Sequence, residues 1–299
     1  MQIGIDLGAS KIESVLLDDN GNEHHRERIE VPKDYKNTLD AIKKIVIELE
    51  RKAGKELPVG VCHPGIHSIH TGLIKNSPNC NWINNKPFQK DLREAVGKEI
   101  FCENDANCFT LSEAIDGSGK HYKIVFGIIL GSGVGGGLVI DKKIVTGPHG
   151  ITGEWGHNQL PLIGKESTVK KTNLREGEIE SSISGLSLQK KFKKEFKKDH
   201  KAHEIFELYR KHDLDAEKIV DEFKDNLSMA IASVVNILDP DVFIFGGGLS
   251  NEIDFFNEIQ SKVRKFVAGN EFEGIFLKPK FGDASGVRGA ARLGRNINY

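Results

Sequence analysis

The segment "DLGASK" at residues 6–11 combines a carboxylate, a small turn, a hydroxyl and a lysine, and could hold a phosphate-bearing ligand. Asp6 can bind Mg²⁺ through water, because Mg²⁺ keeps much of its hydration shell. Ser10 and the backbone amides beside it can contact terminal phosphates. The candidate residues are Asp6, Gly8, Ala9, Ser10 and Lys11.

A second segment, "GSGVGGG" at residues 131–137, places five glycines between two apolar runs. Glycine is tolerated there if the backbone turns sharply or a ligand approaches it closely. The segment is not a Walker A loop, and a strand rather than a helix follows it, which argues against a Rossmann fingerprint. A glycine hairpin without a ligand is equally consistent with this segment alone. The candidate phosphate contacts are Gly131, Ser132, Gly133 and Gly135.

A third glycine turn, "GGGLS" at residues 246–250, follows a buried apolar run. We expect a helix directly after it, whose N-terminus would suit an anion or a nucleotide. Gly247 and Gly248 are the candidate contacts.

Polar residues that could serve an acceptor occur in "ENDAN" and "GEWGHN". Asp105 follows a predicted strand and could accept a proton from an attacking hydroxyl, although an aspartate there is often only a helix N-cap. Glu154 and His157 can exchange hydrogen bonds with adjacent hydroxyls of a polyol. A lone histidine is, however, more often structural.

These segments require an α/β framework. Residues 2–31 alternate as a three-strand meander with a hairpin turn at Asn20-Gly21. A helix with apolar positions from Leu39 to Leu49, two further strands and the helix "ANCFTLSEAID" follow. A strand–glycine turn–strand pattern restarts at residues 123–146, and a long helix is predicted over Asp215–Leu238. We therefore predict two α/β lobes with a central cleft, 1–117 and 118–284, with a C-terminal helix at about 285–299 packed on the first lobe.

Composition excludes several classes of protein. The net charge of −1 gives no overall field for nucleic acid or an anionic membrane, and no apolar run approaches the roughly 20 residues that span a bilayer. The basic segment 189–201 is best explained as a solvated helix face, the alternative being an anionic partner. No signal peptide precedes the first strand, and the four cysteines form no C-x-x-C pair, so we expect free thiols and a cytoplasmic protein.

The three glycine turns resemble the phosphate and adenosine loops of the sugar kinase, hexokinase and actin-like ATPase superfamily, whose fold is ribonuclease H-like. Within it, the whole chain resembles the ROK family of bacterial sugar kinases. The motifs that carry this resemblance are "GIDLGASKIE", "PG" at 64–65, "ENDANC", "GSGVGGG", "GEWGH" and "GDASGVRGAA". The resemblance implies ATP and Mg²⁺ as cofactors, a hexose substrate and a homodimer.

The resemblance also implies roles for individual residues. Asp105 matches the catalytic base, and the matching sugar contacts are Gly65, Asn104, Asp105, Glu154, His157 and Glu180. ROK proteins commonly carry three cysteines that join the histidine on zinc. Lys171, Asn173 and Glu178 occupy those positions here, so we expect no structural zinc. His63, in "CHPG", replaces an apolar residue and has no assigned role.

The contexts of Trp82 and Trp155 favour the fructokinase (mannofructokinase) branch, and so fructose as the acceptor. The alternative is the N-acetylglucosamine kinase branch, or a kinase for another hexose. A catalytically weak sugar sensor is a lesser alternative, because the zinc loop is degenerate. A repressor is disfavoured, because the first strand begins at Gln2 and leaves no room for a DNA-binding domain before it.

Overall fold

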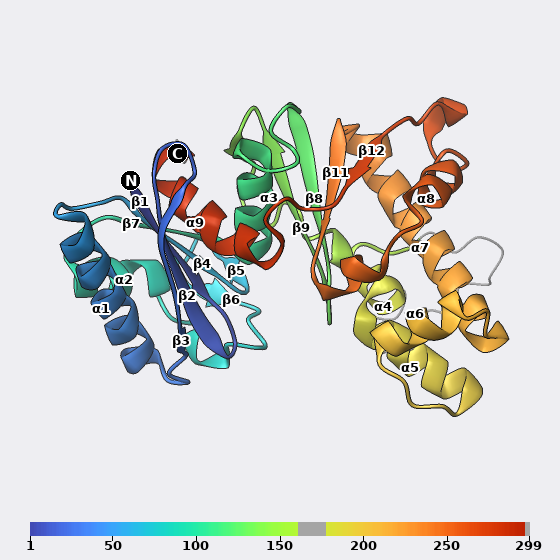
Figure 1. Cartoon of the computed structure of the whole chain (residues 1–299), viewed down its shortest axis with the longest axis horizontal. Helices are drawn as coiled ribbons and strands as arrows, with labels where there is room; N and C mark the ends of the chain where they lie inside the picture. The colour runs from blue at the N-terminus through green and yellow to red at the C-terminus, as the bar shows by residue number, and fades with distance from the viewer. Residues whose placement is uncertain (161–177, 297–299) are drawn as a thin grey trace. The chain divides into compact units, whose positions relative to one another are not determined.

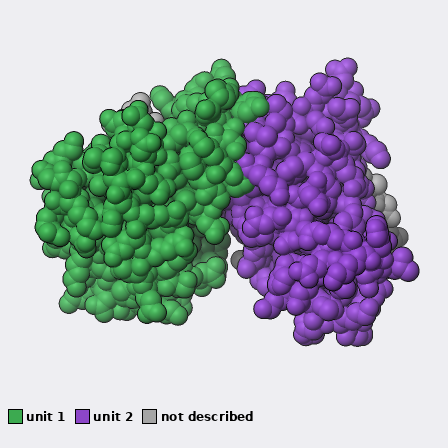
Figure 2. All heavy atoms as spheres, viewed as in Figure 1, with its two compact units in different colours: residues 1–123, 137–153, 279–299 green, residues 124–136, 154–278 purple. Residues whose placement is uncertain are grey.

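The computed structural model describes residues 1–160 and 178–296 of the chain. Within these residues, helices accompany two five-stranded sheets and a small two-stranded sheet, so the α/β fold class is confirmed (Figure 1). The described chain divides into two compact units, shown in green and purple in Figure 2. Unit 1 comprises residues 1–123, 137–153 and 279–299, and unit 2 comprises residues 124–136 and 154–278. The expected lobes, 1–117 and 118–284, and the cleft between them stay predictions.

The first sheet contains the predicted meander and two parallel strands. Its spatial order is β3 (Glu23–Glu30), β2 (Lys11–Leu17), β1 (Gln2–Leu7), β4 (Val59–His63) and β7 (Ile100–Asn104). Strand β1 pairs antiparallel with β2 and parallel with β4, which in turn pairs parallel with β7. The carboxyl ends of β1, β4 and β7 therefore lie at the same edge, where Asp6 and Asn104 are found. The small hairpin is formed by β5 (Ile66–His67) and β6 (Ile74–Lys75).

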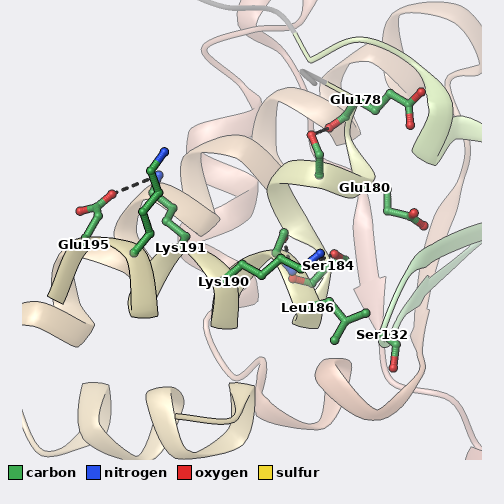
Figure 3. A pocket seen from close by; sticks show the side chains of 11 residues that line it. Ser132, Glu178, Glu180, Ser184, Leu186, Lys190, Lys191 and Glu195 are labelled. Atoms are coloured by element: carbon green, nitrogen blue, oxygen red, sulfur yellow. Dashed lines mark hydrogen bonds and ion pairs between the residues drawn. The ribbon is translucent and has the colours of Figure 1, made fainter. Parts of the chain in front are cut away.

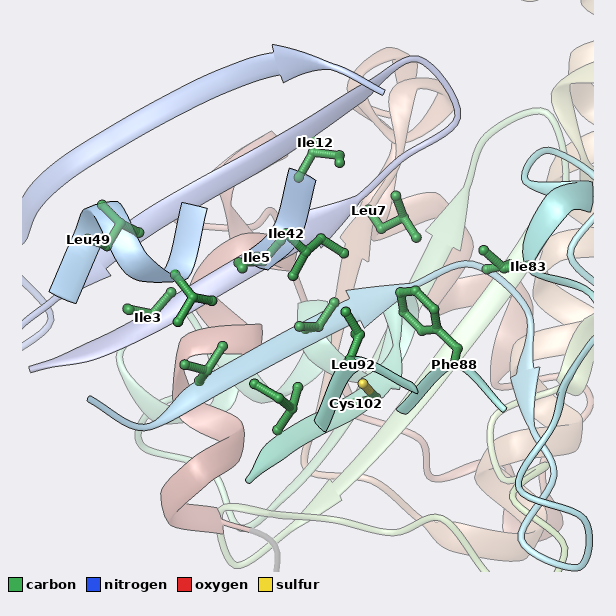
Figure 4. Close-up of a cluster of buried hydrophobic side chains, with 14 of the residues drawn as sticks. Ile3, Ile5, Leu7, Ile12, Ile42, Leu49, Ile83, Phe88, Leu92 and Cys102 are labelled. Carbon is green, nitrogen blue, oxygen red and sulfur yellow. The ribbon is translucent and has the colours of Figure 1, made fainter. Parts of the chain in front are cut away.

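Side-chain alternation along β1 separates two layers of helices. Ile3 and Ile5 enter a core with residues of α1 (Tyr35–Ala53) and α2 (Phe88–Val96), as Figure 4 shows. Gly4 faces the opposite layer, where α9 (Ser285–Asn296) packs beside α3 (Asp105–Ile115). A Cβ atom on Gly4 would lie 2.1 Å from the carbonyl oxygen of Val287, so only glycine allows this approach. Helix α9 therefore lies directly against the sheet.

The second sheet has the order β10 (Lys143–Ile144), β9 (Val134–Ile140), β8 (Ile124–Leu130), β11 (Val242–Gly246) and β12 (Ile275–Leu277). The strands and turn predicted over 123–146 are confirmed as β8, β9 and β10. The long predicted helix is α7 (Leu214–Leu238), which buries Ile219, Phe223 and Leu227 along one face. The remaining α-helices of the described chain are α4 (Glu180–Ile183), α5 (Gly185–Phe196), α6 (Ala202–Arg210) and α8 (Phe256–Val263). Its 3₁₀ helices are Asn81–Ile83, Trp155–His157, Gly248–Glu252, Ala268–Asn270 and Gly282–Ala284.

Phe192 on α5 is fully buried while Lys193 and Lys194 are exposed, which both a solvated basic face and a face for an anionic partner allow. The four cysteines are buried and form no disulfide. No helix in the described ranges 1–160 and 178–296 has the length and apolar character needed to cross a bilayer.

Candidate functional site

The junction between β7 and α3 carries the predicted acceptor residues of unit 1. Asn104 is the N-cap of α3: its side-chain oxygen accepts hydrogen bonds from the backbone N–H groups of Ala106 and Asn107. Asp105 is the first residue of the helix, and its Oδ1 accepts from the N–H of Ala106 at 2.8 Å. The interpretation of Asp105 as the N-cap is therefore wrong, because its neighbour fills that position.

Asn104 also links the junction to the turn that contains Gly65. Its Nδ2 donates to the carbonyl oxygen of Gly65 at 3.1 Å, and its backbone N–H donates to Glu103 Oε1 at 2.7 Å. Glu103 also accepts from Asn107 Nδ2 at 3.1 Å, and burial raises the pKa of this carboxyl. Gly65 has φ +89°, and a Cβ there would lie 2.6 Å from the Lys75 carbonyl oxygen. Asn104 thus fixes both the start of α3 and the Gly65 turn.

The hairpin between β1 and β2 holds the other predicted residues of unit 1. The Gly8 N–H donates to the Lys11 carbonyl at 3.0 Å, which leaves Ala9 and Ser10 exposed at the tip. The Lys11 ammonium lies 3.7 Å from the buried Glu13 carboxylate. Burial raises the pKa of Asp6, the hydrogen bond with the Cys62 thiol opposes this rise, and Glu13 adds to it.

Asp6 has the properties expected of a residue that holds Mg²⁺. Its carboxylate supplies the hard oxygen donors that this ion prefers. A Cβ on Gly286, at the start of α9, would lie only 3.2 Å from Asp6 Oδ2, so the glycine keeps the space beside that oxygen open. A cation there would offset the burial of the Asp6 charge.

The glycine hairpin of unit 2 is fixed by contacts on both sides. The Val134 N–H donates to Glu180 Oε2 at 2.9 Å, and the Gly131 carbonyl accepts from the Gly185 N–H at 2.8 Å. A Cβ on Gly133 would lie 2.6 Å from the same Glu180 oxygen. Glycine at this position therefore allows the Glu180 carboxylate to reach the hairpin.

Glu154, His157 and Glu180, which the family resemblance implies as sugar contacts, come together in unit 2. His157 Nε2 lies 3.6 Å from Glu154 Oε2, and His157 Nδ1 lies 3.4 Å from Glu178 Oε2. Burial raises the pKa of Glu154, His157 opposes this rise, and Glu180 adds to it. Such a cluster can accept and donate hydrogen bonds to adjacent hydroxyls.

Glu178 is the residue of this cluster whose part the sequence does not reveal. The sequence identifies Glu178 only as the replacement of a cysteine, whereas its carboxylate lies 3.4 Å from Nδ1 of the His157 ring. Glu178 lies 21 positions from His157 in the chain, and its sequence neighbours Arg175 and Glu180 give no sign that the two side chains meet.

Lys171 and Asn173 lie outside the described residues. In the described ranges, no group of three or more His, Cys, Asp or Glu side chains could hold a metal ion, and the absence of zinc stays a prediction.

Two of the three glycine turns meet at one cavity of unit 2. This cavity measures about 400 Å³ and is lined by Gly131 and Ser132 from one turn and by Gly248 and Leu249 from the other. Gln189, His203 and Glu252 contribute polar groups. The helix expected directly after the third turn is a five-residue 3₁₀ helix, Gly248–Glu252, and α8 begins only at Phe256. The turn itself has Gly247 at φ +84°, with the Leu130 carbonyl 2.3 Å from where a Cβ would stand.

A larger cavity of about 750 Å³ adjoins the hairpin tip, and Figure 3 shows it from close by. Ser132, Glu178 and Glu180 line one side, and Lys190 and Lys191 extend from α5 on the other. Ser132 belongs to both cavities. The hairpin tip therefore lies between the two hollows of unit 2.

The predicted residues thus form two groups, one in each unit. Unit 1 holds Asp6, Gly8, Ala9, Ser10, Lys11, Gly65, Asn104 and Asp105. Unit 2 holds Gly131, Ser132, Gly133, Gly135, Glu154, His157, Glu180, Gly247 and Gly248. Their roles in catalysis and binding stay predictions.

Comparison with known proteins gives matches along the whole chain. The sequence model of the ROK family matches residues 2–297. N-acetyl-D-glucosamine kinase from Histophilus somni is 34% identical over 301 residues, which cover 98% of each chain. The crystal structure of a ROK hexokinase from Thermus thermophilus superimposes with a TM-score of 0.86 at 26% identity, over 97% of this chain and 96% of that one.

A ROK family glucokinase from Streptomyces griseus, solved in complex with glucose and AMPPNP, has a TM-score of 0.75 at 25% identity, over 99% of both chains. The fold is therefore the two-lobed actin-like ATPase fold of these kinases. The motifs that suggested the family extend from Gly4 to Ala291, and the match to its sequence model covers them all. This chain belongs to the ROK family.

Proposed function

We propose that this protein is an ATP- and Mg²⁺-dependent kinase that phosphorylates a hexose, with N-acetylglucosamine as the first candidate acceptor. The observation that carries the kinase function is the cavity where the 131–132 and 248–249 turns meet. Its glycines leave backbone groups open to phosphates, and Leu249 and Ala202 offer apolar surface to a base. The glucokinase solved with AMPPNP supports ATP as the donor.

Named residues would supply the general base, the acceptor contacts and the Mg²⁺ ligand of this reaction. Asp105 would accept the proton of the attacking hydroxyl, since phosphoryl transfer needs mainly positioning, charge neutralisation and a base. Glu154, His157 and Glu180 would orient the acceptor through its hydroxyls. Asp6 would hold Mg²⁺ through water, and the ion, when bound, neutralises phosphate charge.

The choice of acceptor rests on the relatives. N-acetyl-D-glucosamine kinases from Histophilus somni and from strains of Escherichia coli are 32–34% identical to this chain over nearly its full length. Fructose, which the contexts of Trp82 and Trp155 favoured, is the second candidate. The Trp155 indole donates to the Gly135 carbonyl at 2.9 Å and packs edge-on against Phe126, so its position is explained by the fold.

A coupled assay of ADP release tests this proposal. The purified chain is given ATP, Mg²⁺ and one of N-acetylglucosamine, N-acetylmannosamine, glucose, mannose or fructose. We expect the highest kcat/KM with N-acetylglucosamine. A higher value with fructose would replace the acceptor, and no ADP release above background with any of the sugars, from folded protein, would remove the kinase function.

A further inference from the structure

Two exposed histidines of unit 1, His70 and His149, face each other although 79 positions separate them in the chain. His70 Nε2 lies 3.1 Å from His149 Nδ1, and the ring centroids are 5.3 Å apart. Neither ring has a hydrogen bond or ion pair with a carboxylate among the described residues. The pair plays no part in the proposed reaction.

Both histidines sit on turns that are held by their own backbone. His70 lies in the turn between β5 and β6, where the Gly72 N–H donates to the Ser68 carbonyl at 2.8 Å. His149 lies in the turn where the Thr152 N–H donates to the Thr146 carbonyl at 3.3 Å. The two turns pack directly together: a Cβ on Gly150, which has φ +68°, would lie 2.7 Å from the His67 carbonyl oxygen.

From this geometry we propose that His70 and His149 bind a divalent transition-metal ion, with Zn²⁺ as the probe. Imidazole is the commonest protein ligand of such ions. Zn–N bonds of about 2.0–2.1 Å place two nitrogens of one ion roughly 2.9–3.4 Å apart, for angles between octahedral and tetrahedral. The observed separation of 3.1 Å falls in that range, and rotation of the two rings would direct both lone pairs at one ion. Water completes the shell, because the described residues offer no third ligand.

The ion would replace the shared proton of the histidine pair. In the neutral pair, one ring donates N–H and the other accepts, whereas a metal takes a lone pair from both nitrogens. The metal would tie the turn after β5 to the turn at 146–152 and stabilise both. Protons compete for the same ring nitrogens, so the affinity falls at acidic pH.

The proposed site at His70 and His149 uses other residues than the zinc site that the family resemblance implies. That site involves His157, which lies in unit 2 between Glu154 and Glu178. Zinc binding by this chain would therefore have two possible sources, and the variants His70→Gln, His149→Gln and His157→Gln separate them.

Calorimetric titration of the tag-free chain with Zn²⁺, without nucleotide or sugar, tests the proposal. We expect one ion per wild-type chain, affinity reduced more than about tenfold by His70→Gln or His149→Gln, and retained affinity in His157→Gln. Zn²⁺ should also raise the Tm of the wild type but not that of the double variant His70→Gln/His149→Gln.

As a second readout, the EPR spectrum of bound Cu²⁺ should show two nitrogen ligands in the wild type. Thermal unfolding without metal checks that each variant folds. Wild-type affinity in the folded double variant would overturn the proposal, as would binding that only His157→Gln removes, or no binding by the wild type.

Discussion

The side chains of Asn104 and Asp105 make different hydrogen bonds, and this difference decides how a substitution of either residue can be interpreted. Asn104 uses its oxygen for the cap of α3 and its amide for Gly65, so it supports the local fold. Asp105 directs one oxygen to the first turn of the helix. A substitution of Asp105 therefore leaves the cap intact.

We expect Asp105→Asn to lower kcat by about 10²–10⁴-fold, the usual contribution of a general base. The Tm should change little, because Asn104 still caps α3. Asn104→Ala is the matched control: it should cost about 1 kcal/mol of stability through the lost cap. The measurements are kcat and thermal unfolding on the same preparations. Full activity in folded Asp105→Asn would refute the role of the base.

His63, for which the sequence suggested no role, is fully buried at the end of β4. Its Nδ1 lies 3.2 Å from the Pro64 carbonyl, its ring packs edge-on against Phe88, and its Nε2 has no hydrogen-bond partner among the residues that the structure describes. Burial lowers the pKa of His63 to about 4 from the ordinary value of 6.5. The ring is therefore neutral in the folded protein at neutral pH.

The folded-state pKa lies below the unfolded one, so the unfolded chain binds the extra proton first as the pH falls. The free energy of unfolding should therefore decrease as the pH falls from about 6.5 to about 4, by up to about 3 kcal/mol from this group. Half-buried His67, whose pKa burial also lowers, acts in the same direction. Denaturant unfolding at several pH values gives the free energy of unfolding as a function of pH. Between about pH 6.5 and 4 this free energy should change less steeply with pH in His63→Phe than in the wild type. Phe88→Leu is the control: it removes packing but no titrating group, so its free energy of unfolding should depend on pH as in the wild type. The same pH dependence in His63→Phe would contradict the lowered pKa of His63.

The glycine hairpin between β8 and β9 is the element whose sequence and structure agree most directly. Apolar runs predicted the flanking strands, and the glycines predicted a sharp turn or the close approach of another group. The structure identifies one such group as the Glu180 carboxylate, at Val134 and Gly133. A residue 46 positions away cannot be inferred from local periodicity, because tertiary packing brings it there.

We expect Gly133→Ala to fold but to raise the KM for the acceptor sugar. The new Cβ would meet the end of a flexible side chain, Glu180 Oε2 at 2.6 Å, so the side chain moves and the backbone does not have to. Gly131→Ala is the comparison, because a Cβ there meets no atom within 4 Å. Steady-state kinetics should show the larger rise of acceptor KM in Gly133→Ala. Equal values in both variants would mean that Glu180 does not orient the acceptor.

Other elements show where local patterns are insufficient. The meander β1–β3 was predictable because strand alternation and the Asn20-Gly21 turn are local signals. The helix predicted after Gly247 is a short 3₁₀ helix, a kind that the sequence does not distinguish, since a glycine turn after a strand precedes either a 3₁₀ helix or an α-helix. The contact of Glu178 with His157 depends on chain segments that meet only in the folded unit.

At the scale of the whole molecule, nucleotide binding should raise the free energy of unfolding and the Tm. A non-hydrolysable ATP analogue at 100 times its Kd should add about 2.7 kcal/mol to the free energy of unfolding. Ala202 lines the cavity formed by the two glycine turns and begins α6. Ala202→Glu should abolish most of the Tm increase, because a charged carboxylate would replace the apolar surface proposed for the base, while Ala202→Gln, similar in size but neutral, should keep more of it. Thermal unfolding with and without the analogue measures this difference, and equal shifts in the two variants would place the nucleotide elsewhere.

Helix α9 has a consequence for how the chain is made. It packs against β1, β4 and α3, and a Cβ on Gly60 of β4 would lie 1.9 Å from the Ala290 carbonyl. The ribosome delivers β1 first and α9 after some 280 further residues, so that face of the sheet is uncovered for most of synthesis. Exposed apolar surface of this kind favours aggregation and chaperone binding. A nascent chain stalled before Ser285 would hold an unfinished unit 1, although the whole of unit 2 would already have been synthesised.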